Sequence, residues 1–188
     1  NNYNVAIGYS AGSAVTTGTL NTLLGGLTGD AFTTGTTNTA LGAQALSADT
    51  AGNRSVAVGN AALFAQNFST STNVYNVAVG YEAGAAVSTG TNNVLIGGLA
   101  GDALTVGERN SVLGYNALGA DTKGGQSIAI GYNSLSTQNF TTATDVHNVA
   151  IGYNTGLSVT TGAQNTLIGA LVGDALTDAD FNTAMGYL

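Results

Sequence analysis

The sequence predicts an all-β protein built as a parallel β-solenoid, and two observations carry this prediction. A short motif, Asn-Val-Ala-Ile-Gly at 4–8, returns with small variations to the end of the chain. The motif glycine is found at Gly8, Gly25, Gly42, Gly59, Gly80, Gly97, Gly114, Gly131, Gly152, Gly169 and Gly186. Successive glycines lie 17 residues apart, except for two spacings of 21. A fixed period of this length is typical of a solenoid, in which each repeat forms one coil.

A longer period contains the short one. Three 17-residue units and one 21-residue unit form a super-repeat of 72 residues, seen at 4–75, at 76–147 and, incompletely, at 148–188. We therefore expect one elongated repeat domain over 1–188. The pattern runs to both ends without an evident capping segment, which predicts a piece of a longer fibre.

The motif reads as a short strand with two apolar faces. Its second and fourth positions, such as Val77 and Val79, share one face because side chains alternate along a strand. Its third position, from Ala6 to Ala184, is never polar. We assign the fourth position to the coil interior and the third to a face that another copy of the chain covers.

The rest of each unit predicts a second short strand and two turns. Small residues recur three and six places after the motif glycine, which indicates a narrow coil. Thr-Gly-Thr segments such as 17–19 and 34–36 indicate the outer turn. Eleven coils at the interstrand spacing would form a rod roughly 50 Å long.

The composition excludes several classes of protein. The hydrophobic content is 44%, the formal net charge is −7 and there are only three Lys and Arg residues. We therefore expect neither disorder nor binding to nucleic-acid phosphates or anionic lipid. No apolar run approaches the roughly 18 residues of a membrane span. The absence of Cys excludes disulfides and thiolate metal sites.

Several motifs resemble a known family. Asn-Val-Ala-Ile-Gly-Tyr at 4–9 and 148–153, with Ser-Val-Ala-Val-Gly at 55–59 and Ser-Ile-Ala-Ile-Gly at 127–131, resembles the head repeats of trimeric autotransporter adhesins, the YadA-like family. Units such as 38–46 and 110–118 also resemble repeats of tail-fibre proteins. The resemblance implies a left-handed parallel β-roll, three chains around one axis, and an extracellular place on a cell surface or virion fibre. The units here are longer than those of most adhesin heads.

The 21-residue units carry the candidate binding surface. Their extra residues lie in two polar loops, 68–75 and 140–147. Insertions in solenoids map to loops on one face and often bind ligands. The same loops could instead pack on a neighbouring coil or subunit, and both interpretations stay open. The candidate surface-binding residues are Phe68, Asn73, Tyr75, Phe140, Asp145 and His147.

Other polar residues predict structural roles. His147 is the sole histidine, so a surface or packing role is expected for it rather than catalysis. Asp30, Asp102 and Asp174 recur in Gly-Asp-Ala segments as turn residues or as an ion site made by three symmetry copies. Asp49 and Asp121 are expected in turns. The Asn that opens nine of the eleven motifs predicts a ladder of stacked amides.

Two functions remain. The first is a structural and adhesive module of a trimeric surface fibre, an adhesin head or a phage tail-fibre shaft, which attaches to a host protein or glycan. The alternative is an ice-binding solenoid, which the Thr-rich turns suggest. We expect no enzyme, cofactor or metal site, because no nucleophile, base and orienting group recur together.

Overall fold

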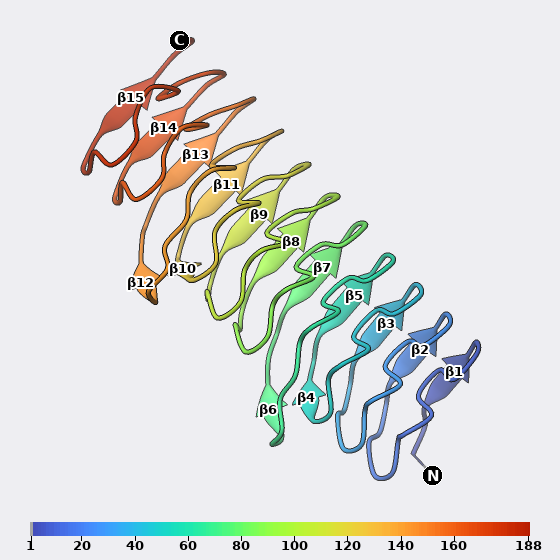
Figure 1. The fold of residues 1–188 in the computed structure, drawn as a ribbon. Coiled ribbons are helices and arrows are strands. Elements are labelled where there is room, and N and C mark those ends of the chain that lie inside the picture. Colours follow the sequence, from blue (N-terminus) through green and yellow to red (C-terminus); the bar gives the residue numbers. More distant parts are fainter. Residues whose placement is uncertain (1) are drawn as a thin grey trace.

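The chain winds into a long rod of stacked coils. The computed structural model describes residues 2–188. The two ends of the chain lie at opposite ends of the rod (Figure 1). Every strand pairing is parallel, and residues 2–188 contain no helix, hence none able to cross a membrane. The prediction of an all-β parallel β-solenoid is confirmed.

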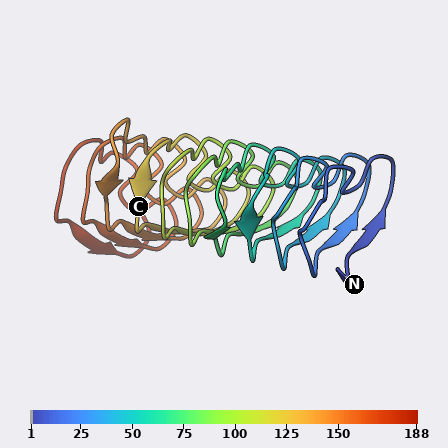
Figure 2. The same cartoon turned by 90° about the horizontal axis from the view of Figure 1, so that it is seen from below.

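One three-residue strand from each coil enters a single eleven-stranded sheet. Its strands in order are β1 (Val5–Ile7), β2 (Thr22–Leu24), β3 (Thr39–Leu41), β5 (Val56–Val58), β7 (Val77–Val79), β8 (Val94–Ile96), β9 (Ser111–Leu113), β11 (Ile128–Ile130), β13 (Val149–Ile151), β14 (Thr166–Ile168) and β15 (Thr183–Met185). Equivalent motif positions pair in register, as Val77 does with Val94. The sheet forms one wall of the rod (Figure 2).

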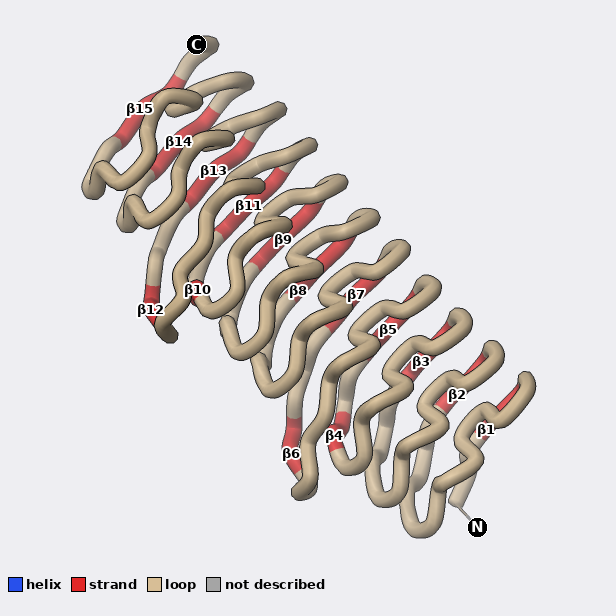
Figure 3. The backbone as a smooth tube through the Cα atoms, viewed as in Figure 1, coloured by secondary structure: helices blue, strands red, loops and turns tan. Residues whose placement is uncertain are grey.

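A second strand occurs only beside the 21-residue units. There β4 (Gly52–Asn53) pairs with β6 (Thr72–Asn73), and β10 (Gly124–Gly125) pairs with β12 (Thr144–Asp145). The prediction of two strands in every unit is therefore wrong for most coils. Figure 3 shows that turns make up most of each coil.

The turns use left-handed backbone at fixed positions. The residue before the first motif position has φ between 48° and 64° in all eleven coils, as at Arg54, Tyr75 and His147. Few non-glycine residues adopt this region, and it persists where surrounding structure holds it. A regular extended strand cannot continue through this residue, so β4 ends at Asn53, just before Arg54.

The motif glycine is required for two reasons. Gly80 has a φ of 145°, which side-chain-bearing residues rarely adopt. A Cβ at this position would lie 2.4 Å from the carbonyl oxygen of Gly97 in the next coil. The close stacking of coils thus leaves no space for a side chain.

The coil interior is lined by the third motif position, contrary to our assignment. This position is fully buried in nearly every coil, as at Ala78 and Leu95, whereas the fourth position is half-buried or exposed, as at Val79 and Ile96. Leu95 fits inside because glycines flank it: a Cβ at Gly84 would lie 2.6 Å from Leu95 Cδ1, and one at Gly101 would lie 2.9 Å from Leu95 Cδ2. The second and fourth positions therefore form the outer face.

The motif asparagines form a buried ladder. Asn21 Oδ1 accepts hydrogen bonds from the Asn38 backbone N–H at 3.0 Å and from Asn38 Nδ2 at 3.2 Å. Asn38 Nδ2 also donates to the carbonyl of Gly52 at 2.9 Å. Because the asparagines between the end coils are buried, this row stabilises the stacking and is not a binding surface.

Candidate binding surfaces

An uncharged apolar stripe follows the outer face of the eleven-stranded sheet. It consists of the second and fourth motif positions, which hold only Val, Ile, Leu, Met, Thr or Ser. Side chains within it are widely exposed: Ile7 by 59%, Leu41 by 41%, Leu113 by 48% and Ile151 by 36%. At about 4.8 Å per coil the stripe runs for roughly 50 Å. Monomers rarely expose an apolar patch beyond a few hundred Å².

The two loops are anchored at their bases by a buried carboxylate. Asp49 Oδ1 accepts from the backbone N–H groups of Gly52 at 3.0 Å and Phe68 at 3.1 Å. Its Oδ2 accepts from Gln66 Nε2 at 2.6 Å. Asp49 is thus a turn residue, as predicted, but it is fully buried and also ties the loop to the coil before it.

The second loop repeats this anchor. Asp121 Oδ1 accepts from the N–H groups of Gly124 at 2.9 Å and Phe140 at 3.1 Å, and Gln138 Nε2 donates to Asp121 Oδ2 at 2.5 Å. Both glutamines are fully buried. Asp49 and Gln66 recur 72 residues later as Asp121 and Gln138. This recurrence is the sequence signal that could have identified the cluster.

Buried glutamine also bridges the break in the Asn ladder. Where Ser55 replaces the motif Asn, Gln66 Nε2 donates to Ser55 Oγ at 3.1 Å. Asn76 Nδ2 in the next coil donates to Gln66 Oε1 at 3.0 Å. The smaller serine thus makes room for the longer amide, and hydrogen bonding continues between the coils.

The six candidate residues separate into an anchored and an exposed set. Phe68 and Phe140 are half-buried, and their backbone N–H groups bind the anchoring aspartates. Asn73, Tyr75, Asp145 and His147 are exposed. The two loops lie four coils apart, about 20 Å, so the structure does not bring the six together.

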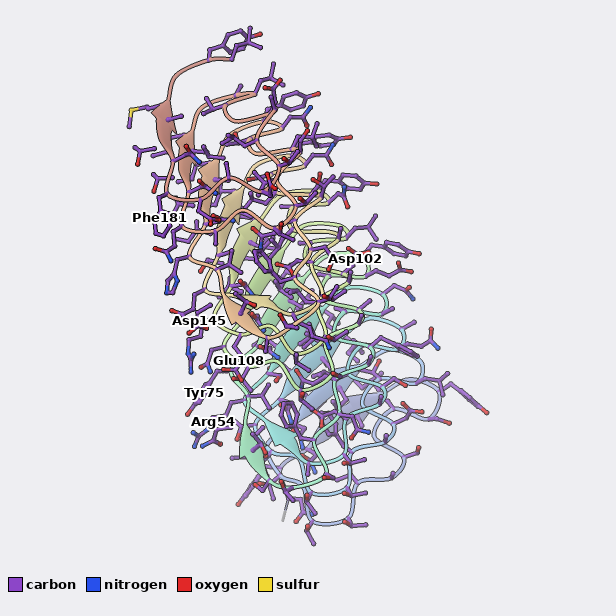
Figure 4. The ribbon with its side chains drawn as sticks, turned by 60° about the vertical axis from the view of Figure 1, so that its left-hand side comes forward. Arg54, Tyr75, Asp102, Glu108, Asp145 and Phe181 are labelled. Carbon is purple, nitrogen blue, oxygen red and sulfur yellow. The ribbon has the colours of Figure 1, made fainter. Side chains whose placement is uncertain are left out.

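Local contacts hold the exposed aromatic residues. The Arg54 guanidinium lies 5.5 Å from the centre of the Tyr75 ring and donates to the Tyr75 hydroxyl. His147 Nδ1 lies 3.1 Å from the carbonyl oxygen of Asp145. Figure 4 shows Arg54, Tyr75, Glu108 and Asp145 along one side of the rod and Asp102 on the other.

A row of tyrosines follows the motif glycines. The rings of Tyr115, Tyr132 and Tyr153 stack, with centroid separations of 5.5 Å and 5.6 Å. About half of each side chain is exposed. The coil spacing sets this ladder, which presents a regular aromatic edge to solvent.

The Gly-Asp-Ala aspartates differ from one another. Asp30 Oδ1 accepts from the Ser47 hydroxyl, whereas Asp102 Oδ1 is buried without a partner among residues 2–188. Burial raises the pKa of Asp102, backbone hydrogen bonds lower it, and the nearby charge of Glu82 raises it further. Asp174 is exposed.

The threonines that come just before the outer turns form hydrogen bonds within the solenoid. The hydroxyls of Thr16, Thr33 and Thr105 donate to main-chain carbonyls of the following coil at 3.0, 3.1 and 2.8 Å. These hydroxyl protons therefore form hydrogen bonds between stacked coils.

Comparison of the chain with protein-family models, with characterised proteins and with solved structures finds no match. The stripe, the two anchored loops and the tyrosine ladder are therefore the observations from which a function is argued.

Proposed function

We propose that the chain is a structural and adhesive module of a homotrimeric surface fibre, in which identical copies meet through the apolar stripe. The observation that carries this proposal is the uncharged stripe along all eleven strands of the outer sheet face. Covering it would remove several hundred Å² of apolar surface per chain from water.

A second copy of the same chain is the occupant that fits this face. The stripe lies parallel to the rod axis, so parallel copies related by a rotation axis along the rod would cover every stripe equally. Cyclic closure also leaves no stripe free for open-ended association. Three copies, rather than two, and an extracellular place follow from the resemblance to adhesin and tail-fibre repeats.

The attachment surfaces are the features away from the stripe. The small sheets of the two loops lie on a different wall of the rod from the main sheet (Figure 2). The loops would therefore remain in solvent after the copies assemble. Both a protein and a glycan on a target surface fit such polar and aromatic groups.

The ice-binding alternative lacks a comparable observation. Ice binding needs a flat, regular array of free hydroxyl groups, but the outer turns change from Thr-Gly-Thr at 17–19 to Val-Gly-Glu at 106–108. A second row of hydroxyl groups is interrupted by Asn67 and Asn139, and it donates its protons to the next coil, as Thr16 does to the main-chain carbonyl of Thr33.

The assembly is tested by sedimentation velocity and native mass spectrometry at micromolar concentration. The wild-type chain should form trimers, and the double variant Val79→Glu, Ile96→Glu should be monomeric yet retain its β-sheet circular dichroism. Thr89→Glu, on an exposed turn, is the matched control and should remain trimeric. A stable wild-type monomer, or an intact trimer in the double variant, would contradict the proposal.

Attachment is tested separately with beads. Beads coated with wild-type trimers should adhere to cells or glycan surfaces that uncoated beads do not bind. Adhesion that is equal for coated and uncoated beads would contradict the adhesive part and leave a purely structural shaft.

A further inference from the structure

A hollow opens beside the second loop, between β12 and the turns of the two preceding coils. Its volume is about 340 Å³, and its lining includes Val106, Glu108, Lys123, Gly125, Ala143 and Asp145. This volume lies at the lower end of the range for small-molecule sites, about 300 to 1,000 Å³. Figure 4 shows Glu108 and Asp145 on the same side of the rod.

The first super-repeat shows what fills the equivalent place. There Asn53 stands 72 residues before Gly125. Asn53 Oδ1 accepts from the Thr36 backbone N–H at 2.8 Å and from the Thr36 hydroxyl at 2.9 Å, and Asn53 Nδ2 donates to Ser71 Oγ at 3.0 Å. A carboxamide therefore closes the wall of the rod at this point.

The second super-repeat lacks both this amide and its hydroxyl partners. Gly125 replaces Asn53, Glu108 replaces Thr36, and Ala143 replaces Ser71. The backbone N–H of Glu108, which corresponds to the donor of Thr36, has no acceptor among residues 2–188. A Cβ at Gly125 would lie 2.9 Å from the Glu108 carbonyl oxygen, 3.5 Å from this nitrogen and 3.7 Å from Asp145 Oδ1. The hollow thus retains a donor on one side of the missing amide and gains a carboxylate on another.

The charges in the lining distinguish it from the equivalent place in the first super-repeat. Glu108, Lys123 and Asp145 have the uncharged counterparts Thr36, Ala51 and Asn73. Lys123 balances one carboxylate of the lining, and the Arg109 guanidinium, 3.5 Å from the Glu108 carboxylate, balances the other. The hollow therefore has no excess charge that would select an anion or a simple cation. Carboxylate and ammonium groups together suit the hydroxyl groups of a sugar, which both donate and accept hydrogen bonds.

We propose that this hollow binds a sugar residue that carries an acetamido group, an N-acetylhexosamine, with the amide in the place of the missing Asn53 side chain. The amide oxygen accepts from the Glu108 backbone N–H, and the amide N–H donates to the carboxylate of Asp145. Val106 packs on the acetyl methyl group, and Lys123 and Glu108 bind ring hydroxyls. This inference rests on the adhesive function and names a glycan as its target.

The test titrates the wild-type trimer with N-acetylglucosamine and N-acetylgalactosamine, with glucose and galactose as controls, by saturation-transfer NMR and calorimetry. At least one N-acetyl sugar should bind with a Kd of about 1 mM. Glucose and galactose should bind at least tenfold more weakly. Equal binding with and without the acetamido group, or no binding at tens of millimolar, would overturn the proposal.

Variants copied from the first super-repeat sharpen the test. Gly125→Asn fills the hollow with the residue that already occupies the equivalent coil, and it should weaken binding at least tenfold. Because its Cβ would lie 2.9 Å from the Glu108 carbonyl oxygen, circular dichroism first checks that the variant is folded. Asp145→Asn and Lys123→Ala should each weaken binding several-fold, whereas Asn73→Ala in the other loop should not. Full binding by folded Gly125→Asn would overturn the assignment.

The outcome is separable from that of the proposed function. If Gly125→Asn trimers adhere to a target surface as well as wild-type trimers do, the sugar site is wrong but the adhesive fibre stands. If the chain is monomeric yet binds the sugar, the trimer fails and the site stands.

Discussion

The carboxylate of Asp30 accepts a hydrogen bond from the hydroxyl of Ser47 at 2.7 Å. One super-repeat later the same carboxylate is Asp102, and Gly119 stands in the place of Ser47. Asp102 Oδ1 is consequently buried without a partner among the described residues. The loss of one hydroxyl thus leaves the Asp102 carboxylate without the hydrogen bond that Asp30 accepts.

We therefore expect Asp102→Asn to raise the melting temperature at neutral pH. Burial raises the folded-state pKa of Asp102 above its ordinary value of 3.8, and the charge of Glu82 adds to this. A raised carboxyl pKa means that the folded state binds the proton more tightly, so stability is lost as pH rises through the folded-state pKa. The amide removes this loss, because it has no charge to desolvate.

The gain should be largest at neutral pH and should disappear below about pH 4, where both states of the wild-type carboxyl are protonated. Thermal unfolding followed by circular dichroism between pH 3 and 8 measures it. Asp30→Asn is the control and should give no comparable gain. A lower melting temperature for Asp102→Asn at pH 7 would show that the charge is stabilised by other contacts.

Adjacent residues of β8 should respond differently to truncation. Leu95 is fully buried between Gly84 and Gly101, so Leu95→Ala should lower the free energy of unfolding by about 2 to 5 kcal/mol. Ile96 points to the outer face, and Ile96→Ala should cost less when unfolding is measured in the Val79→Glu background, once sedimentation has shown that this single variant is monomeric. Denaturant titration compares the two, and a larger cost at Ile96 would reverse the assignment of faces.

Glycine should be essential at the motif position and dispensable one residue later. Gly97→Ala introduces a side chain at a φ of 132° and places its Cβ 2.4 Å from the carbonyl oxygen of Gly114. We expect a loss of at least about 1 to 3 kcal/mol from backbone strain. Gly98→Ala has its nearest atom at 3.5 Å, in the Tyr115 ring, and should be almost neutral. Similar melting temperatures for the two variants would contradict the close approach of coils.

The buried amide at the first loop should be as important as an apolar core residue. Gln66→Leu leaves Asp49 Oδ2 without its donor and removes the acceptor of Asn76 Nδ2. Each buried group that loses its partner costs about 1 to 3 kcal/mol. Amide hydrogen exchange should also become faster at Phe68, whose N–H binds Asp49. Gln164→Leu, at an exposed position, is the control, and an equal effect there would indicate general destabilisation.

The sequence by itself determined the stacking of the coils. The return of the motif glycine sets the length of each coil, and the matching motif positions set the register that pairs Val77 with Val94. Glycine and the regular spacing, with four extra residues looped out of two units, are sufficient here, because parallel in-register stacking follows whenever each coil repeats the same backbone path. The position of the two loops followed from the 21-residue units in the same way.

Only the tertiary structure decided which face of each strand lies inside. Alternation separates Leu95 from Ile96, but both rows are apolar, and a period of two is the same for either choice. The choice depends on volume, because Leu95 fits only where Gly84 and Gly101, from two neighbouring coils, leave space. The hollow at Gly125 has the same origin: it exists because Glu108 and Ala143, on separate coils, meet a glycine where Thr36 and Ser71 meet Asn53. Packing between coils joins residues that no local pattern connects, and this is why stacking could be predicted from the sequence whereas the inner face and the hollow required the folded chain.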